Sequence, residues 1–205
     1  MDKIVLATNN KHKINDFKNL FKDIEIQTSN DVGFFNEIVE DGKTFYDNAL
    51  IKAKTLFEFL KEKNFDAIVI ADDSGLCVNA LDGRPGVYSA RYAGNHDVKA
   101  ARSKLLEELK DKDDRSAYYE CVLVAILPNG KIISAEGKTY GHILEKECGT
   151  TDFGFDRLFY SDDLGKPFGF ATDDERNRVS HRGKALQNLK AKLLEANVLL
   201  NDDKK

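Results

Sequence analysis

The sequence predicts an α/β fold in which helices flank a mixed β-sheet, and three features of the chain support this. Two short apolar runs, residues 4–7 and 67–71, have the length and β-branched content of buried strands. Two further strand-like segments, residues 117–127 and 131–135, flank Pro128-Asn129-Gly130, which is typical of an antiparallel hairpin. Because apolar residues at helical spacing follow the first run and precede the second, crossover and hairpin connections are expected together, and the sheet must be mixed.

The composition fits one domain over residues 1–200, followed by a frayed tail at residues 201–205. With 205 residues, 41% hydrophobic and 32% charged, the chain is long enough to bury one core. Its net charge is −4, and its basic residues are dispersed among acids, so neither a nucleic acid polymer nor a membrane surface is expected as its main partner. Three cysteines without CxxC spacing indicate neither a disulfide framework nor structural zinc.

The first apolar run is expected to form a strand that leads through a polar turn into a helix. Ile14, Phe17 and Phe21 share one face of that helix. Many α/β proteins bind phosphate at such a helix start, where backbone N–H groups and the positive end of the helix dipole meet. A solvated polar loop is the alternative. The candidate phosphate ligands are Thr8, Asn9, Asn10, Lys11, His12 and Lys13.

Three more helices are predicted further along the chain. Thr44 and Asp47 have the spacing of a capping box and begin a long amphipathic helix. Apolar residues recur at helical spacing over residues 98–109. Ser180 is placed to cap a last helix with a leucine-rich face.

The second apolar run is expected to end at Asp72 and Asp73. Open α/β sheets place their ligand sites beyond the carboxyl ends of strands, so this acidic pair is a candidate site. Successive strand side chains point to opposite faces, so at most one of the two faces a given ligand. An Asx turn that merely ends the strand explains the pair equally well.

Glu40 lies in another acidic turn, just before the long predicted helix. A Mg²⁺ ion typically takes one or two carboxylates together with phosphate oxygens, so Glu40 and Asp73 would suffice if the fold brought them together. Their spacing does not decide this. Taken alone, Glu40 is better explained as part of a solvated turn.

Two segments near the C-terminus have unusual composition. Residues 176–183 place three arginines and a histidine around a predicted helix start, which favours an anion site over a solvated basic loop. Residues 151–156 combine aromatic rings, a glycine and carboxylates, and such a segment can stack on a nucleobase. An aromatic strand edge packed into the core is the commoner use of this pattern.

Six segments occur in a consistent order along the chain. They are Thr8-Asn9-Asn10 with Lys13, Glu40-Asp41-Gly42-Lys43-Thr44-Phe45 with Asn48-Ala49-Leu50-Ile51-Lys52-Ala53, Ala71-Asp72-Asp73-Ser74-Gly75-Leu76, residues 85–94, Phe153-Gly154-Phe155-Asp156, and Ser180-His181-Arg182-Gly183-Lys184-Ala185-Leu186. Together they resemble the Ham1-like inosine triphosphate pyrophosphatase family, in its bacterial XTP/dITP diphosphatase branch. The resemblance runs from residue 4 to about residue 190.

This resemblance implies an elongated two-lobed α/β fold with a long mixed sheet, an active-site cleft between the lobes, and a homodimer. It implies Mg²⁺-dependent conversion of dITP, ITP and XTP to monophosphate and pyrophosphate. The implied metal ligands are Glu40 and Asp73, and Asp73 is also the implied acceptor of the water proton. The implied substrate ligands are residues 8–13, Ser74, Phe153, Gly154, Phe155, Asp156, Arg176, His181 and Arg182.

Three positions depart from the family pattern. Arg176 stands where a lysine is usual, and Asp152 and Arg157 replace the glycine and proline that commonly flank the phenylalanine motif. An arginine keeps the charge of lysine but changes its donor geometry. These departures affect the expected nucleobase contacts more than the reaction.

Three alternative functions are disfavoured by particular features of the sequence. A Maf-type pyrophosphatase acting on pyrimidine or modified nucleotides would differ in substrate preference, and residues 180–183 argue against it. A non-enzymatic nucleotide sensor would have no need of both Glu40 and Asp73. A P-loop enzyme is disfavoured because the chain has no G-x-x-x-x-G-K-[ST] motif. Since the first apolar run is too short for a signal peptide or a membrane span, a cytoplasmic protein is expected.

Overall fold

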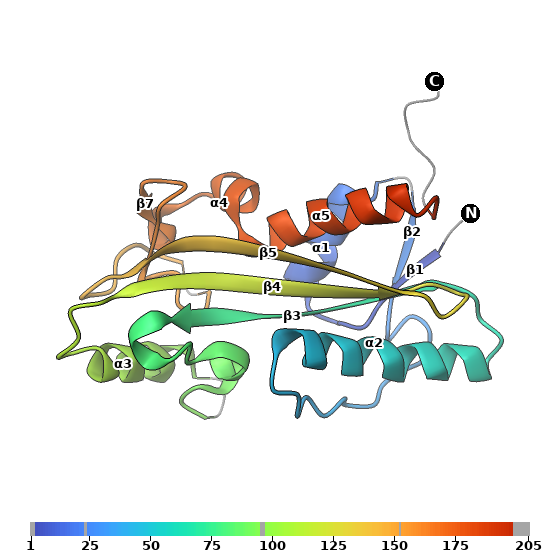
Figure 1. Cartoon of the computed structure of the whole chain (residues 1–205), viewed down its shortest axis with the longest axis horizontal. Coiled ribbons are helices and arrows are strands. Elements are labelled where there is room, and N and C mark those ends of the chain that lie inside the picture. The colour runs from blue at the N-terminus through green and yellow to red at the C-terminus, as the bar shows by residue number, and fades with distance from the viewer. Residues whose placement is uncertain (1–2, 23, 95–96, 152, 199–205) are drawn as a thin grey trace, which may run out of the picture. The chain divides into compact units, whose positions relative to one another are not determined.

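The computed structural model describes residues 3–22, 24–94, 97–151 and 153–198 (Figure 1). The predicted tail at residues 201–205 and Asp152 lie outside the described residues. The helices and strands are β1 Lys3–Leu6, α1 Lys11–Leu20, β2 Glu25–Thr28, α2 Phe45–Glu62, β3 Ile68–Val78, α3 Val98–Glu108, β4 Ser116–Ile126, β5 Ile132–Ile143, β6 Phe159–Ser161, β7 Lys166–Pro167, α4 Asp173–Val179 and α5 His181–Glu195.

The strands form one mixed sheet in the order β2-β1-β3-β4-β5-β6-β7. Strand β1 pairs in parallel with β2 and with β3, whereas β6 pairs antiparallel with β5 and with β7. Strands β4 and β5 are neighbours joined by a tight turn, in which the Leu127 N–H donates to the Lys131 carbonyl at 2.9 Å. The predicted hairpin and the predicted mixed sheet are therefore confirmed.

The described chain divides into two compact units. Of the described residues, the first unit contains those within 3–73, 122–136 and 185–198, and the second contains those within 74–121 and 137–184. Strands β3, β4 and β5 each contribute residues to both units.

The first unit is organised around α2. Its predicted capping box is present, because Thr44 and Asp47 each accept a hydrogen bond from the other's backbone N–H. The apolar face of α2 packs onto strands β1, β3 and β4, and the buried core includes Val5, Ala53, Leu56, Val69 and Val124. Helix α5 lies on the other side of these strands (Figure 1), where Lys192 Nζ donates to the Ser134 carbonyl at 2.7 Å.

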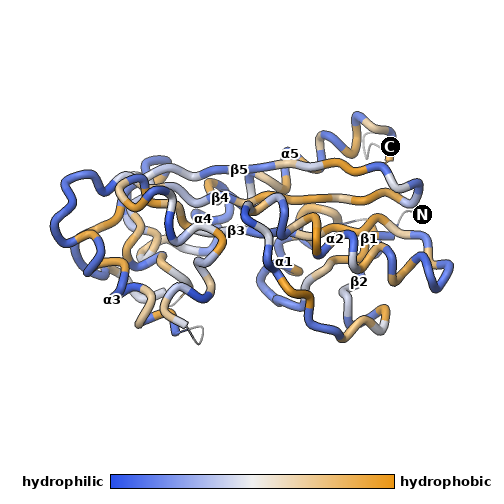
Figure 2. The backbone as a smooth tube through the Cα atoms, turned by 60° about the horizontal axis from the view of Figure 1, so that its bottom comes forward, coloured by the Kyte–Doolittle hydropathy of each residue, from blue (hydrophilic) through white to orange (hydrophobic). Residues whose placement is uncertain are grey.

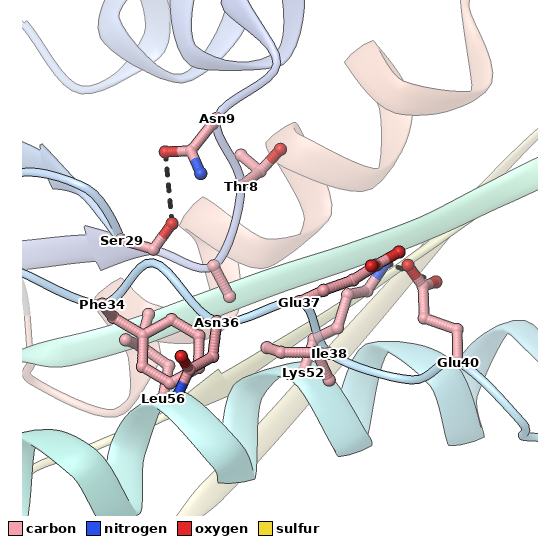
Figure 3. Close-up of a pocket in the computed structure, with 11 residues that line it drawn as sticks. Thr8, Asn9, Ser29, Phe34, Asn36, Glu37, Ile38, Glu40, Lys52 and Leu56 are labelled. Carbon is pink, nitrogen blue, oxygen red and sulfur yellow. Dashed lines mark hydrogen bonds and ion pairs between the residues drawn. The ribbon is translucent and has the colours of Figure 1, made fainter.

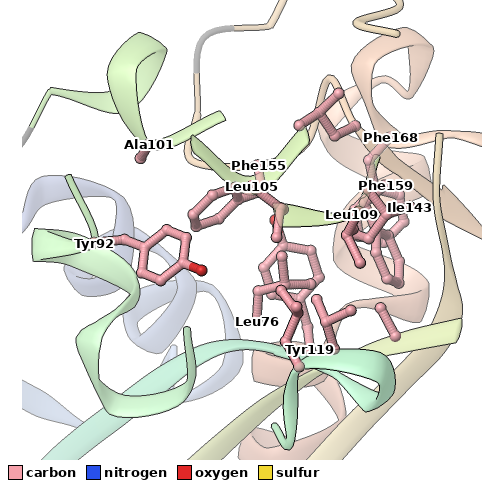
Figure 4. Close-up of a cluster of buried hydrophobic side chains, with 14 residues drawn as sticks. Leu76, Tyr92, Ala101, Leu105, Leu109, Tyr119, Ile143, Phe155, Phe159 and Phe168 are labelled. Atoms are coloured by element: carbon pink, nitrogen blue, oxygen red, sulfur yellow. The ribbon is translucent and has the colours of Figure 1, made fainter. Parts of the chain in front are cut away.

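The second unit has its own aromatic core (Figure 4). Leu105, on the predicted apolar face of α3, and Leu109, just after the helix ends, are both buried in that core. Tyr119 of β4 packs edge-on against Phe159, with ring centroids 4.8 Å apart. The same core holds Leu76, Val78, Tyr92, Ile143, Phe155 and Phe168.

The prediction that the second apolar strand stops at two aspartates is wrong. Strand β3 continues through Asp72 and Asp73 to Val78. Both carboxylates accept hydrogen bonds from side chains of the first unit, so neither needs a turn to satisfy it. Beyond the pair, Leu76 and Val78 are fully buried, which supports continued extended backbone.

The basic segment at residues 176–183 is mostly helical rather than a loop. Residues 173–179 form α4, which begins with a capping box between Thr172 and Glu175. The predicted cap of the last helix is confirmed, because Ser180 Oγ accepts from the Gly183 N–H at 3.0 Å. The positive charges therefore lie on a short helix and at the start of the next one.

Hydrophobic and hydrophilic stretches alternate along the chain (Figure 2). Within the described ranges, no helix combines the length and the apolar character needed to cross a bilayer.

Candidate functional site

The polar turn after β1 begins α1, as predicted. Asn10 is the N-cap, and its Oδ1 accepts from the His12 N–H at 3.0 Å and from the Lys13 N–H at 3.4 Å. Thr8 Oγ1 accepts from the Asn10 N–H at 3.2 Å, and Asn9 Oδ1 accepts from Ser29 Oγ at 3.2 Å. Asn10 thus has a structural role in capping, and two of the first N–H groups of the helix are already bonded to it.

Lys13 is tied to the acidic pair of β3. Its Nζ lies 2.9 Å from each carboxylate oxygen of Asp72, whose side chain is 2% exposed. A buried carboxylate is costly unless it is paired, and Lys13 supplies that pairing. Of the two adjacent aspartates, Asp72 is therefore the one neutralised from α1.

Asn48 links the other aspartate to the acidic turn at residues 40–42. Asn48 Nδ2 donates to Asp73 Oδ2 at 2.9 Å, and Asn48 Oδ1 accepts from the Gly42 N–H at 2.8 Å. A side chain at Gly42 is not possible without rearrangement, since an added Cβ would lie 2.7 Å from that same Oδ1. One buried amide thus fixes both acidic segments.

Lys52 lies at the centre of the acids. Its Nζ donates to Glu40 Oε2 at 2.8 Å, and only 8% of the residue is exposed. Burial alone would lower the pKa of its ammonium group, but the charges of Asp72, Asp73 and Glu40 raise that pKa above its ordinary value. Lys52 therefore remains positively charged, and its field reaches all three carboxylates.

A cavity of about 210 Å³ in the first unit brings the two predicted ligand segments together (Figure 3). Thr8 and Asn9 line it from the turn after β1, and Glu40 and Lys52 line it from the acidic turn and α2. We refer to Lys13, Glu40, Asn48, Lys52, Asp72 and Asp73 as the Lys52 cluster. The exposed Lys11 and His12 lie on the first turn of α1, immediately after Asn10.

The described residues contain no group of three or more His, Cys, Asp or Glu side chains arranged to hold a metal ion by themselves. Glu40 and Asp73 nevertheless offer carboxylate oxygens around one shared ammonium group. This donor set fits Mg²⁺, which commonly binds through one or two carboxylates and completes its coordination with water and phosphate oxygens.

In the second unit, Asp156 is the buried acid of the predicted base-binding segment. It is 3% exposed, and its oxygens accept from Arg176 Nη1 at 3.0 Å and from the Tyr119 hydroxyl at 3.3 Å. Burial raises its pKa to about 6, against the opposing effect of Arg176. This carboxylate therefore titrates much nearer neutrality than an exposed aspartate.

The aromatic residues of this segment divide between surface and core. Phe153 is 44% exposed, and the Arg176 guanidinium lies 5.8 Å from its ring centroid. Phe155 is buried in the core of the second unit, and Gly154 between them has a φ of +48°. Core packing thus explains Phe155, whereas Phe153 keeps an exposed face.

His181 and Arg182 begin α5 beside these groups. The His181 ring stacks on Tyr119 with centroids 4.9 Å apart. Arg182 Nη2 donates to Ser74 Oγ at 3.4 Å, and Arg182 is 8% exposed. We refer to Tyr119, Phe153, Asp156, Arg176 and His181 as the Asp156 cluster.

Sequence reasoning did not select Asn48, Lys52 or Tyr119 as site residues. A signal for the first two was present, because they are polar residues four apart beside the apolar face of a long helix. That spacing places them on one face, where burial requires specific partners. Tyr119 carried no such signal, since an aromatic residue in a strand is ordinary packing.

A known protein family matches most of the chain. The family model described as the Ham1 family matches residues 4–192. The chain belongs to the Ham1 family. A Clostridium perfringens relative called dITP/XTP pyrophosphatase is 47% identical over 199 residues, covering 94% of this chain and 98% of the relative. A Campylobacter jejuni relative with the same name is 43% identical over 188 residues, covering 90% and 94%.

Solved structures of Ham1 proteins have the same fold. The Staphylococcus aureus Ham1 protein superimposes with a TM-score of 0.87 at 38% identity, covering 95% of this chain and all of that one. A Mycobacterium abscessus structure entitled nucleoside-triphosphatase / dITP/XTP pyrophosphatase gives a TM-score of 0.75 at 34% identity, covering 90% and 97%. The mixed α/β architecture is therefore the Ham1 fold.

Proposed function

We propose that this chain hydrolyses deaminated purine nucleoside triphosphates, namely dITP, ITP and XTP, to the monophosphate and pyrophosphate. The observation that carries the proposal is the Lys52 cluster, in which Lys52 and Glu40 line a cavity together with the turn after β1. The charges of Asp72 and Asp73 act on the same ammonium group. Relatives named dITP/XTP pyrophosphatase match nearly the whole chain and support the choice of substrate.

We propose Mg²⁺ as the cofactor, with Glu40 and Asp73 as its protein ligands. The cluster contains two ammonium groups and three carboxylates, so it carries a net negative charge. A polyanionic substrate would be repelled by that charge unless a cation accompanied it. When bound, Mg²⁺ supplies positive charge to the phosphate oxygens and lowers the cost of charge developing on them.

The chain's own residues then position and deprotonate the attacking water. The oxygen of water attacks the α-phosphorus in line, the bond to the bridging oxygen breaks, and pyrophosphate leaves. Asp73 accepts the water proton, and Asn48 holds the Asp73 carboxylate in place through its Oδ2. The lysines of the Lys52 cluster and residues 8–13 bind the triphosphate oxygens.

Base selection is assigned to the Asp156 cluster, with Ser74 and Arg182. A purine can stack on the exposed face of Phe153, while Asp156 accepts from a ring N–H and Arg176, His181 or Arg182 donates to the 6-oxo oxygen. Adenine has a 6-amino group and no proton on N1, so it would leave both partners unpaired. Unpaired buried polar groups are costly, and this difference supports selectivity for deaminated purines.

Two further predictions belong to the same proposal. A cytoplasmic enzyme would meet its substrates in the nucleotide pool, where deaminated purines arise. The homodimer implied by the resemblance is also proposed, and the sedimentation of the purified protein tests it directly.

The test is release of pyrophosphate in the presence of Mg²⁺ from dITP, ITP and XTP, beside dATP, dGTP and dTTP. We expect rapid release from the first three, and a loss of at least about 100-fold in kcat for Asp73→Asn, because the general base is removed. Asp66→Asn is the matched control, since Asp66 is 75% exposed and its carboxylate lies 3.3 Å from Lys61 Nζ, outside the Lys52 cluster. A preference for dTTP would favour a Maf-type enzyme, and binding of ITP without any release would favour a sensor.

A further inference from the structure

Two residues proposed to receive the base, Phe153 and Asp156, lie in an irregular connection. Residues 144–158, between β5 and β6, contain no helix or strand among those that the structure describes. Loops of this length without secondary structure are uncommon in compact proteins and are often functional. Their backbone must be held by contacts other than a ladder or a helix.

Two arginines hold this backbone through its carbonyl groups. Arg157 Nε donates to the Thr151 carbonyl at 2.7 Å, and its Nη2 donates to the Thr150 carbonyl at 3.0 Å. Arg102, from α3, donates through Nη1 to the Gly154 carbonyl at 3.1 Å. The carbonyls on both sides of Phe153 are thus bonded to guanidinium groups.

Glu147 pairs with both arginines, one through each carboxylate oxygen. Its Oε1 lies 2.9 Å from Arg102 Nε, and its Oε2 lies 3.6 Å from Arg157 Nη1. The Arg102 side chain is only 4% exposed, so its charge needs a nearby counter-ion. Glu147 supplies that charge from within the same connection.

We propose that Glu147 is a positioning residue for nucleobase selection, because it holds Arg102 and Arg157 where they fix the backbone that carries Phe153 and Asp156. This inference rests on the proposed function, in which those two residues receive the purine. A preformed segment binds a base without first having to be ordered, so the clamp of Glu147, Arg102 and Arg157 acts on substrate affinity and discrimination.

The test compares Glu147→Gln with wild type under steady-state turnover of dITP and dATP. We expect KM for dITP to rise about tenfold while kcat stays within about twofold, and the preference for dITP over dATP to fall by a similar factor. Glu145→Gln is the matched control, because Glu145 is exposed in the same connection and undergoes the same change of charge. We expect it to behave as wild type.

Cys148 offers a second measurement that does not depend on turnover. Its N–H donates to the Arg157 carbonyl at 2.8 Å, and it is partly exposed, whereas Cys77 and Cys121 are buried. We expect a thiol reagent to label Cys148 several-fold faster in Glu147→Gln than in wild type, because local opening of the clamp exposes it. If Glu147→Gln does not fold, Arg157→Lys takes its place, because lysine keeps the charge of arginine but loses its forked donors. We expect Arg157→Lys to raise both the KM for dITP and the rate at which Cys148 is labelled.

The two proposals fail in distinguishable ways. If wild type shows no selective release of pyrophosphate from dITP, the proposed function fails before any variant is made, and the role of the clamp fails with it. If wild type is selective but Glu147→Gln keeps the wild-type KM and labelling rate, the clamp alone is refuted. A fall in kcat at unchanged KM would also overturn a positioning role.

Discussion

The Lys52 cluster and the Asp156 cluster both bury carboxylates beside cations, but with opposite electrostatic results. In the first, three acids surround Lys52 and raise the pKa of its ammonium despite its burial. In the second, one buried acid faces Arg176, and burial still raises the pKa of Asp156 to about 6. The comparison indicates that an excess of acids keeps Lys52 positively charged in the first cluster, whereas the buried acid of the second cluster lies near its titration point.

Removing the positive charge of Lys52 should have the largest effect on stability. Lys52→Met leaves Glu40, Asp72 and Asp73 without their shared positive charge, so we expect the free energy of unfolding to fall by about 4 kcal/mol. Millimolar Mg²⁺ should restore more stability to this variant than to wild type, because the ion can replace the missing charge. Chemical denaturation with and without Mg²⁺ measures both effects.

Lys61→Met is the control for this change, since Lys61 lies on the same helix and is 46% exposed. We expect it to alter stability by well under about 1 kcal/mol. Equal losses in the two variants would contradict the central place of Lys52 in its cluster.

The Asp156 cluster should make the free energy of unfolding depend on pH. The folded-state pKa of Asp156, about 6, lies above its ordinary value of 3.8, so the native protein binds this proton more tightly than the unfolded chain. Its contribution to stability is therefore full below about pH 4 and is lost as pH rises through about 6, a change of about 3 kcal/mol. Asp156→Asn should remove this component from a plot of unfolding free energy against pH between 4 and 7.

The same titration predicts an effect on substrate. Because the ionised carboxylate is the form that accepts a ring N–H, KM for dITP should rise as pH falls below about 6. An unchanged KM between pH 5 and pH 7 would mean that Asp156 does not contact the base as a carboxylate.

The smallest expected effect concerns Tyr119. Tyr119→Phe removes the hydroxyl that donates to Asp156 at 3.3 Å but keeps the ring that stacks on His181. We expect a loss of about 1 kcal/mol in stability and a further rise in the pKa of Asp156, seen as a shift of the KM profile to higher pH. Tyr140→Phe, at a residue that is 58% exposed, should leave that profile in place.

Local sequence signals were sufficient for much of the fold. The hairpin at residues 128–130 and the capping box of Thr44 and Asp47 depend on neighbours in the chain, and both are present. Strands β6 and β7 have three and two residues, too few for any period to be read from them. Thr172 and Glu175 have the spacing of a capping box, which is a local signal for the start of α4. The segment was interpreted from its basic residues alone, so this signal was not used.

The candidate site residues were predicted from motifs, but their contacts could not be predicted in the same way. The course of β3 through its aspartates depends on Lys13, 59 residues earlier, and on Asn48, and no local propensity carries that information. The same holds for Arg157, which was noted only as a departure from proline and proves to bond the carbonyls of Thr150 and Thr151. Pairing between distant residues decides which charged side chain becomes buried, so the residue type at one position cannot predict its burial.

The most direct test of the central claim is hydrolysis of dITP in water enriched in oxygen-18, with dATP run beside it, followed by mass spectrometry of the products. We predict rapid formation of dIMP carrying one heavy oxygen and of unlabelled pyrophosphate, with dATP turned over far more slowly. Label in pyrophosphate, release of orthophosphate as the first product, or equal rates with dATP would contradict it.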